Sequence, residues 1–295
     1  MLAPSEQQKR FVIYGVGGSG KTQFCVKFAS DNWHGFWGVF WIDASNPKAA
    51  EQAFTNIARI GQLDERPESG IYWLAIQEKP WLLIIDNADG TGFDNARYFP
   101  PSDKGHILVT SRNPECKVHA TIGFEEFQHL EEEEAITLLL RASFLQSGSD
   151  TRTRETARPV VQALGCLPLA SIQAGASIRQ NICSLEEYLD VFRSYKKRIL
   201  SNTLQGGGSY GHTIFTTFEV SYNRIRSLGT IEATDAIELL HIMVFLHFDQ
   251  IPETIFQNVW AAYGVPGRPR EERQHLKRLP TFLRAFLVIL ASSQG

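Results

Sequence analysis

The sequence has few cysteines, no long apolar run and no strong excess of charge of either sign. Its four cysteines lie far apart, and no two of them form a C-x-x-C pair. This spacing excludes the common zinc-site and disulfide-framework patterns and favours free thiols in a reducing compartment.

The lack of a long apolar run and of a strong net charge limits the partners that the chain can have. The most apolar late stretch, residues 282–291, is too short to span a bilayer and contains Arg284. The polar start of the chain does not resemble a signal peptide. The formal net charge of −3 gives no field that would attract a polyanion. We therefore expect a cytoplasmic protein with no membrane and no nucleic acid among its partners.

What the sequence does contain is a phosphate-binding motif near its start. An apolar run from Phe11 leads into GVGGSGKT, which matches G-x-x-x-x-G-K-[ST] at every fixed position. The glycines let backbone N–H groups turn toward a phosphate, and the helix expected next adds its positive dipole end. Lys21 is expected to contact the β- and γ-phosphates, and Thr22 to ligate Mg²⁺. The expected nucleotide-binding residues of this loop are Gly15, Gly17, Gly18, Ser19, Gly20, Lys21, Thr22 and Gln23.

Further short apolar runs predict a parallel sheet around this loop. Strands are expected over residues 38–42, 81–85 and 106–110, with a short fifth strand near 120–122. Helical patterns follow the loop and the second strand. Strands that alternate with helices indicate an α/β fold that binds ligands at the carboxyl ends of its strands.

An aspartate directly follows the strand expected over residues 81–85. Asp86 is therefore a Walker B candidate that can hold Mg²⁺ through water, across the site from Lys21 and Thr22. The next residue is Asn87, which cannot act as a base, whereas many fast P-loop ATPases have a glutamate there. Asp89 is the candidate substitute. Our hypothesis is that hydrolysis is slow and that the nucleotide serves as a bound switch.

Two more polar residues follow expected strands. Arg112 comes just after residues 106–110, where a guanidinium can reach a γ-phosphate, although a solvated loop arginine is the plain alternative. Asp43, after residues 38–42, either supports the phosphate site or caps the next helix. For the latter role Ser45 and Asn46 are also candidates.

From residue 130 onward the patterns are helical. Gly165 suits a left-handed helix end, and Pro168 can open the next helix. A glycine-rich stretch over residues 205–211 predicts a linker before the last helices.

Taken together, the chain resembles the NB-ARC domain of STAND-class, NLR-like signalling NTPases, especially those of fungi. The resemblance rests on FVIYGVGGSGKT, VFWIDAS, WLLIIDNAD, ILVTSRNP and GCLPLA. It implies a P-loop domain over residues 1–128, a helical subdomain over 129–204 and a partial winged-helix domain over 212–295. Relative to the family, the chain is expected to be truncated at both ends.

The resemblance also implies roles for individual residues. Pro168 would lie against the adenine base, Asp86 would support Mg²⁺ together with Thr22, and Arg112 would sense the γ-phosphate. Asp86, Asp89 and Arg112 are thus the candidate catalytic residues, and ADP or ATP with Mg²⁺ the expected cofactors.

The function implied is an ADP/ATP switch that controls self-association or contact with partner signalling proteins. A stand-alone NTPase or phosphotransferase is one alternative. A remnant that no longer cycles is the other, because the family's Met-His-Asp motif and its base-clasping residues before the first strand are missing from the sequence.

Overall fold

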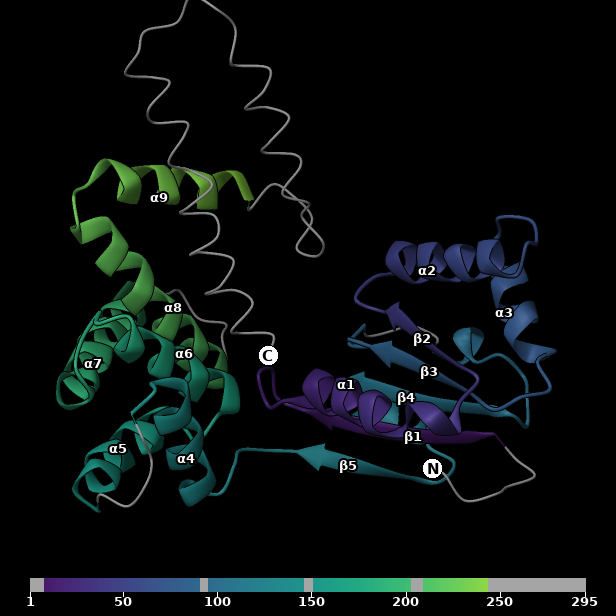
Figure 1. Ribbon diagram of the computed structural model, residues 1–295, viewed down its shortest axis with the longest axis horizontal. Coiled ribbons are helices and arrows are strands. Elements are labelled where there is room, and N and C mark those ends of the chain that lie inside the picture. Colours follow the sequence, from purple (N-terminus) through teal and green to yellow (C-terminus); the bar gives the residue numbers. More distant parts are fainter. Residues whose placement is uncertain (1–7, 91–94, 146–150, 203–208, 244–295) are drawn as a thin grey trace, which may run out of the picture. The chain divides into compact units, whose positions relative to one another are not determined.

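The computed structural model describes residues 8–90, 95–145, 151–202 and 209–243. The chain divides into two compact units, Met1–Leu130 and Glu131–Gly295, and each is described by itself (Figure 1).

The first unit is an α/β fold built on a sheet of five parallel strands. The strand order is β2-β3-β4-β1-β5, and each neighbouring pair is parallel. The strands are β1 (Lys9–Gly15), β2 (Gly38–Asp43), β3 (Trp81–Asp86), β4 (Gly105–Ser111) and β5 (Gly123–Phe127). The α/β fold predicted from alternating strands and helices is confirmed. In this order β1, β3 and β4 lie inside the sheet, so the segments that follow them gather at one edge.

Helices cover both faces of this sheet (Figure 1). α1 packs on one face, where Cys25 joins a core cluster with Leu82 and Leu108. α2 and α3 pack on the other face. The helical segments are α1 (Lys21–Asn32), η1 (Trp33–Gly35), α2 (Pro47–Ile60), α3 (Pro67–Ala75), η2 (Asn95–Tyr98) and η3 (Pro114–His119).

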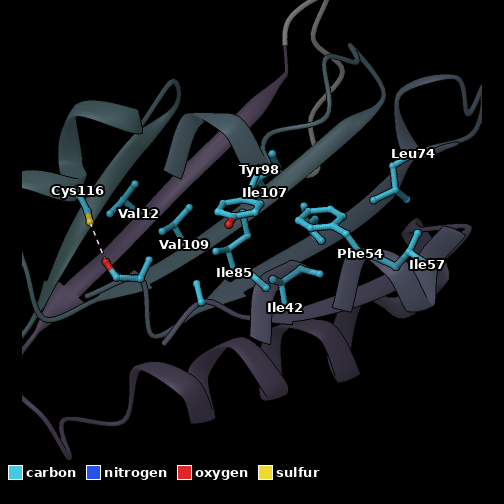
Figure 2. Close-up of a cluster of buried hydrophobic side chains, with 14 of the residues drawn as sticks. Val12, Ile42, Phe54, Ile57, Leu74, Ile85, Tyr98, Ile107, Val109 and Cys116 are labelled. Atoms are coloured by element: carbon cyan, nitrogen blue, oxygen red, sulfur yellow. Dashed lines mark hydrogen bonds between the residues drawn. The ribbon is translucent and has the colours of Figure 1, made fainter. Parts of the chain in front are cut away.

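The core explains why the central strands read as continuous apolar runs. β3 is buried at every position, because its successive side chains enter the two opposite layers. Leu83 and Ile85 pack on the side of α2 and α3, around Phe54, whose ring stacks on Tyr98 with centroids 5.7 Å apart (Figure 2). A shift of β3 by one residue would exchange both layers at once, so the register that places Asp86 at the strand end is strongly fixed.

Two elements differ from the expectation. The fifth strand is Gly123–Phe127, not residues 120–122, because pairing with β1 begins at Phe11 opposite Gly123. The sequence of this strand is not a continuous apolar run, because it contains Glu125 and Glu126, which are exposed on this edge strand. Helix α3 was not expected at all, although its proline in the first turn is a typical helix start.

In the second unit, the described residues form helices joined by loops, with no strand among them. Arg158 on α5 pairs with Glu132 and, at 2.7 Å, with Glu133 on α4. Pro168 lies in the first turn of α6, and Gly165 before it has φ 67°, as predicted for a helix end. The helices are α4 (Glu132–Ala142), α5 (Thr151–Ala163), α6 (Pro168–Arg179), α7 (Leu185–Asn202), α8 (Ser209–Ser227) and α9 (Ile231–Met243).

Some predictions for this unit fall partly or wholly outside the described residues. Residues 205–208 of the expected linker are among these, whereas residues 209–211 form the start of α8. Most of the expected winged-helix domain, from residue 244 on, also lies outside them. Among the helices that the structure describes, none combines the length and apolarity needed to cross a bilayer.

Candidate nucleotide-binding site

The predicted site residues of the first unit come from three adjacent strand ends. β1 ends at Gly15 and continues into the P-loop, β3 ends at Asp86, and β4 ends at Ser111. Since β4 lies between β1 and β3, the segments that follow these strands meet at the same edge of the sheet.

The P-loop connects β1 to α1 with a sharp change of direction. Gly20 adopts φ 95°, a left-handed conformation that favours glycine, and its carbonyl accepts a hydrogen bond from Phe24 N at 2.9 Å. The Ser19 hydroxyl is buried and has no hydrogen-bond partner among the described residues. A buried polar atom of this kind needs a partner, and a phosphate oxygen in the loop would supply one.

Lys21 folds over this loop. Its Nζ donates to the carbonyl oxygens of Gly15 at 2.8 Å and Val16 at 2.9 Å. Burial lowers the pKa of Lys21, and Arg112 lowers it further, while Asp89 and Asp86 oppose the shift. Lys21 therefore interacts electrostatically with all three candidate catalytic side chains.

Asp86 links the P-loop to β4. The Thr22 hydroxyl donates to both carboxylate oxygens of Asp86, at 3.0 and 3.1 Å, and the Thr110 hydroxyl donates to Oδ1. Burial raises the pKa of Asp86, whereas these two hydroxyls lower it. A hydroxyl and a carboxylate side by side form a set of hard oxygen donors, which fits Mg²⁺.

Thr110 is a site residue that the sequence analysis missed. Its hydroxyl also accepts from Asn87 N at 3.1 Å, so it fixes the backbone just after Asp86. The available signal was a hydroxyl residue at the end of the apolar strand expected over residues 106–110.

Arg112 and Asp89 form an ion pair above the loop. Arg112 N donates to Asp89 Oδ1 at 2.6 Å, and Arg112 Nε donates to Asp89 Oδ2 at 2.5 Å. The Arg112 side chain is 66% exposed, whereas that of Asp89 is only 22% exposed. The base role of Asp89 stays a prediction, and both of its oxygens are engaged by Arg112.

Asn87 and Asp43 complete this edge. Asn87 has φ 60°, and its Nδ2 donates to Asp43 Oδ1 at 3.4 Å. Asp43 also accepts from the backbone and hydroxyl of Ser45, at 3.0 and 2.9 Å. The side-chain cap of α2 is Asn46, which accepts from Ala49 N at 3.0 Å. Asn46 and not Asp43 therefore caps α2, while Asp43 contacts the segment after Asp86, and its supporting role at the phosphate site stays a prediction.

Two further predicted residues are Gln23, which follows Thr22 on α1, and Pro168, which lies in the other unit. Gln23 is exposed in the first turn of α1. Pro168 belongs to the second unit, and its contact with adenine stays a prediction.

No protein-family model matches the chain. A nucleotide-binding leucine-rich repeat (NLR)-like protein of Hyaloscypha variabilis is 30% identical to it over 222 residues, which is 65% of this chain and 22% of that protein. The predicted resemblance to NLR-like proteins is confirmed. The chain spans less than a quarter of the length of this NLR-like relative.

The chain also resembles solved structures. One is a STAND protein with a tetratricopeptide repeat sensor from Pyrococcus horikoshii (TM-score 0.38, 13% identity), matched over 97% of this chain and 55% of that one. Another is the Drosophila ORC bound to DNA (TM-score 0.41, 9% identity), matched over 98% of this chain and 80% of that one. The fold assignment rests on the sheet order of the chain itself.

We predict that Asp86→Asn removes the dependence of nucleotide affinity on Mg²⁺. The asparagine can still accept from Thr22 and Thr110, but it lacks the negative charge that a divalent cation requires. Affinity for ATP measured with Mg²⁺ and with EDTA should differ in the parent protein and coincide, within about twofold, in the variant. Asp31→Asn, on the exposed part of α1, is the matched control. An undiminished Mg²⁺ effect in Asp86→Asn would exclude Asp86 from the metal site.

Proposed function

We propose that this chain binds ADP and ATP at the P-loop and acts as a nucleotide-dependent switch of the NB-ARC/STAND type. The observation that carries the proposal is the contact of Thr22 with Asp86. It places the hydroxyl of a complete G-x-x-x-x-G-K-T motif on the carboxylate at the end of β3. The name of the NLR-like relative, which describes a nucleotide-binding protein, supports the same class of ligand.

The residues present fit a Mg²⁺–nucleotide pair. Thr22 and Asp86 would hold the ion, and the unpartnered Ser19 hydroxyl would face phosphate oxygens. When bound, the ion supplies positive charge against the β- and γ-phosphates. Lys21 adds a second cation, because its Nζ needs only to leave two backbone carbonyls to reach a phosphate.

Discrimination between ATP and ADP requires groups that contact only the γ-phosphate. In this site we assign that role to Arg112. Its Cδ lies 3.8 Å from the position of a Cβ on Gly17, so the side chain lies next to the loop. Reversal of a two-state population from 1:99 to 99:1 needs about 5.5 kcal/mol of differential affinity. One arginine together with a metal ion is a reasonable source of such a difference, because charge-assisted hydrogen bonds are the strong ones.

The site favours holding the nucleotide over rapid hydrolysis. Asn87 follows Asp86 and its carboxamide cannot take a proton from water. The Asp86 carboxylate is engaged by Thr22 and Thr110, and that of Asp89 by Arg112. We therefore propose slow hydrolysis at most, with self-association or partner binding in the cytoplasm as the output.

The test has two steps. Freshly purified protein is denatured, and any released nucleotide is identified by chromatography; bound ADP or ATP is the expected result. The protein is then saturated with ADP or with a non-hydrolysable ATP analogue and Mg²⁺, and its molar mass and unfolding temperature are measured. At 100-fold excess over the Kd, each nucleotide should stabilise its preferred state by about 2.7 kcal/mol. Identical mass and unfolding temperature in both states would overturn the switch.

Turnover at rates typical of motor ATPases would favour a stand-alone NTPase. Absence of nucleotide binding would favour a remnant that no longer cycles.

A further inference from the structure

We propose that Asp89 positions Arg112 toward the γ-phosphate and thereby sets the preference of the site for ATP over ADP. Asp89 would act through Arg112, as a positioning residue and not as a base. The inference rests on the proposed function, because it concerns how the same site distinguishes the two nucleotides.

The geometry of the ion pair leaves one side of the guanidinium available. Asp89 Oδ1 accepts from the main-chain N of Arg112 at 2.6 Å, and Oδ2 accepts from Nε at 2.5 Å. The carboxylate thus holds the backbone and the inner edge of the same residue. Within the described part of the chain, the terminal Nη groups of Arg112 donate no hydrogen bond to another residue. Those two groups carry the donors that bind a phosphate in a bidentate manner.

Asp89 is itself held by the end of β4. Ala88 N donates to the carbonyl of Thr110 at 2.9 Å. The carbonyl of Ala88 accepts from Ser111 Oγ at 2.8 Å. It also accepts from Cys116 Sγ at 3.3 Å, which is the dashed line in Figure 2. A less exposed carboxylate on a fixed segment therefore restrains an arginine that is 66% exposed. Without this restraint, the long side chain would lose much rotamer freedom on binding a phosphate.

The restrained arginine lies next to the phosphate loop. Its Cδ lies 3.8 Å from the position of a Cβ on Gly17, and Lys21 Nζ contacts the carbonyls of Gly15 and Val16 in the same loop. Both Arg112 and Lys21 are therefore near enough to act on one phosphate group. Pre-organisation of this kind increases affinity, since the ordering cost is met before the ligand binds.

A competing interpretation makes the opposite prediction. If Asp89 withheld Arg112 from the γ-phosphate, removal of its charge would increase the affinity for ATP. If Asp89 orients Arg112, the same change decreases it. The sign of the effect separates the two interpretations.

The experiment compares Asp89→Asn with the parent protein, using ADP and the ATP analogue AMP-PNP, each with Mg²⁺, by titration calorimetry. In Asp89→Asn, an amide nitrogen faces Nε, so the charge-assisted hydrogen bond that restrains Arg112 is lost. We expect affinity for AMP-PNP to fall about tenfold, as for loss of one charge-assisted hydrogen bond, and affinity for ADP to change by less than about twofold. Asp31→Asn, which removes an exposed ion pair on α1, is the matched control and should change neither.

A double-mutant cycle with Arg112→Gln tests whether Asp89 acts through Arg112. The effect of Asp89→Asn on AMP-PNP should disappear in the Arg112→Gln background. Arg112→Lys keeps the charge but lacks Nε. It should therefore lose the preference for AMP-PNP, as Asp89→Asn does. If Asp89→Asn fails to fold, Arg112→Lys still tests the proposal. If Arg112→Gln weakens AMP-PNP while Asp89→Asn and Arg112→Lys do not, only the role of Asp89 is overturned. If the parent protein binds neither nucleotide, or binds both equally, the proposed function is overturned as well.

Discussion

Replacing Lys21 with alanine is expected to weaken the binding of ADP and of Mg²⁺–ATP about 100-fold or more. The ammonium group of Lys21 is the strongest positive charge that the P-loop itself supplies. Hydrogen bonds to charged groups contribute about 1.5–3 kcal/mol each, and Lys21 has donors for more than one phosphate oxygen. Burial of this lysine, which lowers its pKa, also strengthens its interaction with a phosphate by excluding water. Fluorescent-nucleotide titration measures the change directly.

The fold should tolerate this change. Within the described part of the chain, the hydrogen bonds of Lys21 Nζ go to the loop carbonyls of Gly15 and Val16, so its removal leaves the core clusters intact. We expect the free energy of unfolding without nucleotide to change by less than about 1 kcal/mol. Lys27→Ala, in the middle of α1, removes the same charge from an exposed ion pair and should leave nucleotide affinity unchanged. Binding by Lys21→Ala that equals that of Lys27→Ala would contradict the placement of the phosphates in this loop.

The central part of the fold and site could be predicted because its signals are local. The spacing from Gly15 to Thr22 specifies a phosphate loop, and an aspartate after a buried strand specifies the opposite side. The two could be joined without a structure, since parallel strands end at the same edge of a sheet. The contact of Thr22 with Asp86 is the result.

The ion pair of Asp89 with Arg112 could not be predicted in the same way. It depends on where the segment after β3 turns, and that turn is fixed by hydrogen bonds from Ser111 and Cys116 to Ala88. None of these contacts leaves a periodic pattern. The sequence indicated the residue types at the site but not which side chains contact one another, so it gave no sign that Asp89 accepts hydrogen bonds from Arg112.

The outermost strand β5 was predicted less well than the central strands for a related reason. Central strands are buried on both faces and appear as apolar runs, as β3 does. β5 has one neighbour, β1, and exposes Glu125 and Glu126, so its sequence carries little strand signal. The last residue of β1, Gly15, was assigned to phosphate binding alone, although it also faces the backbone of β5.

Replacing Gly15 with alanine is therefore expected to destabilise the first unit as well as the site. Gly15 pairs with Phe127 at the end of β5, and a Cβ built on it would lie 2.0 Å from the Phe127 carbonyl oxygen. Its φ of 144° is also one that L-residues with a side chain rarely adopt. The clash is with backbone, so relief requires that β5 move away from β1. We expect the free energy of unfolding to fall by about 3 kcal/mol or more, which corresponds to a loss of about 10 °C in unfolding temperature.

Gly17→Ala is the matched control within the same loop. A Cβ at Gly17 would meet only Arg112 Cδ, at 3.8 Å, which is an ordinary contact with a movable side chain. Its unfolding temperature without nucleotide should stay within about 2 °C of the parent protein, since surface changes are mostly within 0.5 kcal/mol. The two variants separate the architectural role of the motif from its chemical role, because both alter a P-loop glycine and only one alters the pairing of β1 with β5. Equal unfolding temperatures for Gly15→Ala and Gly17→Ala would mean that β5 does not approach β1 as closely as the structure shows.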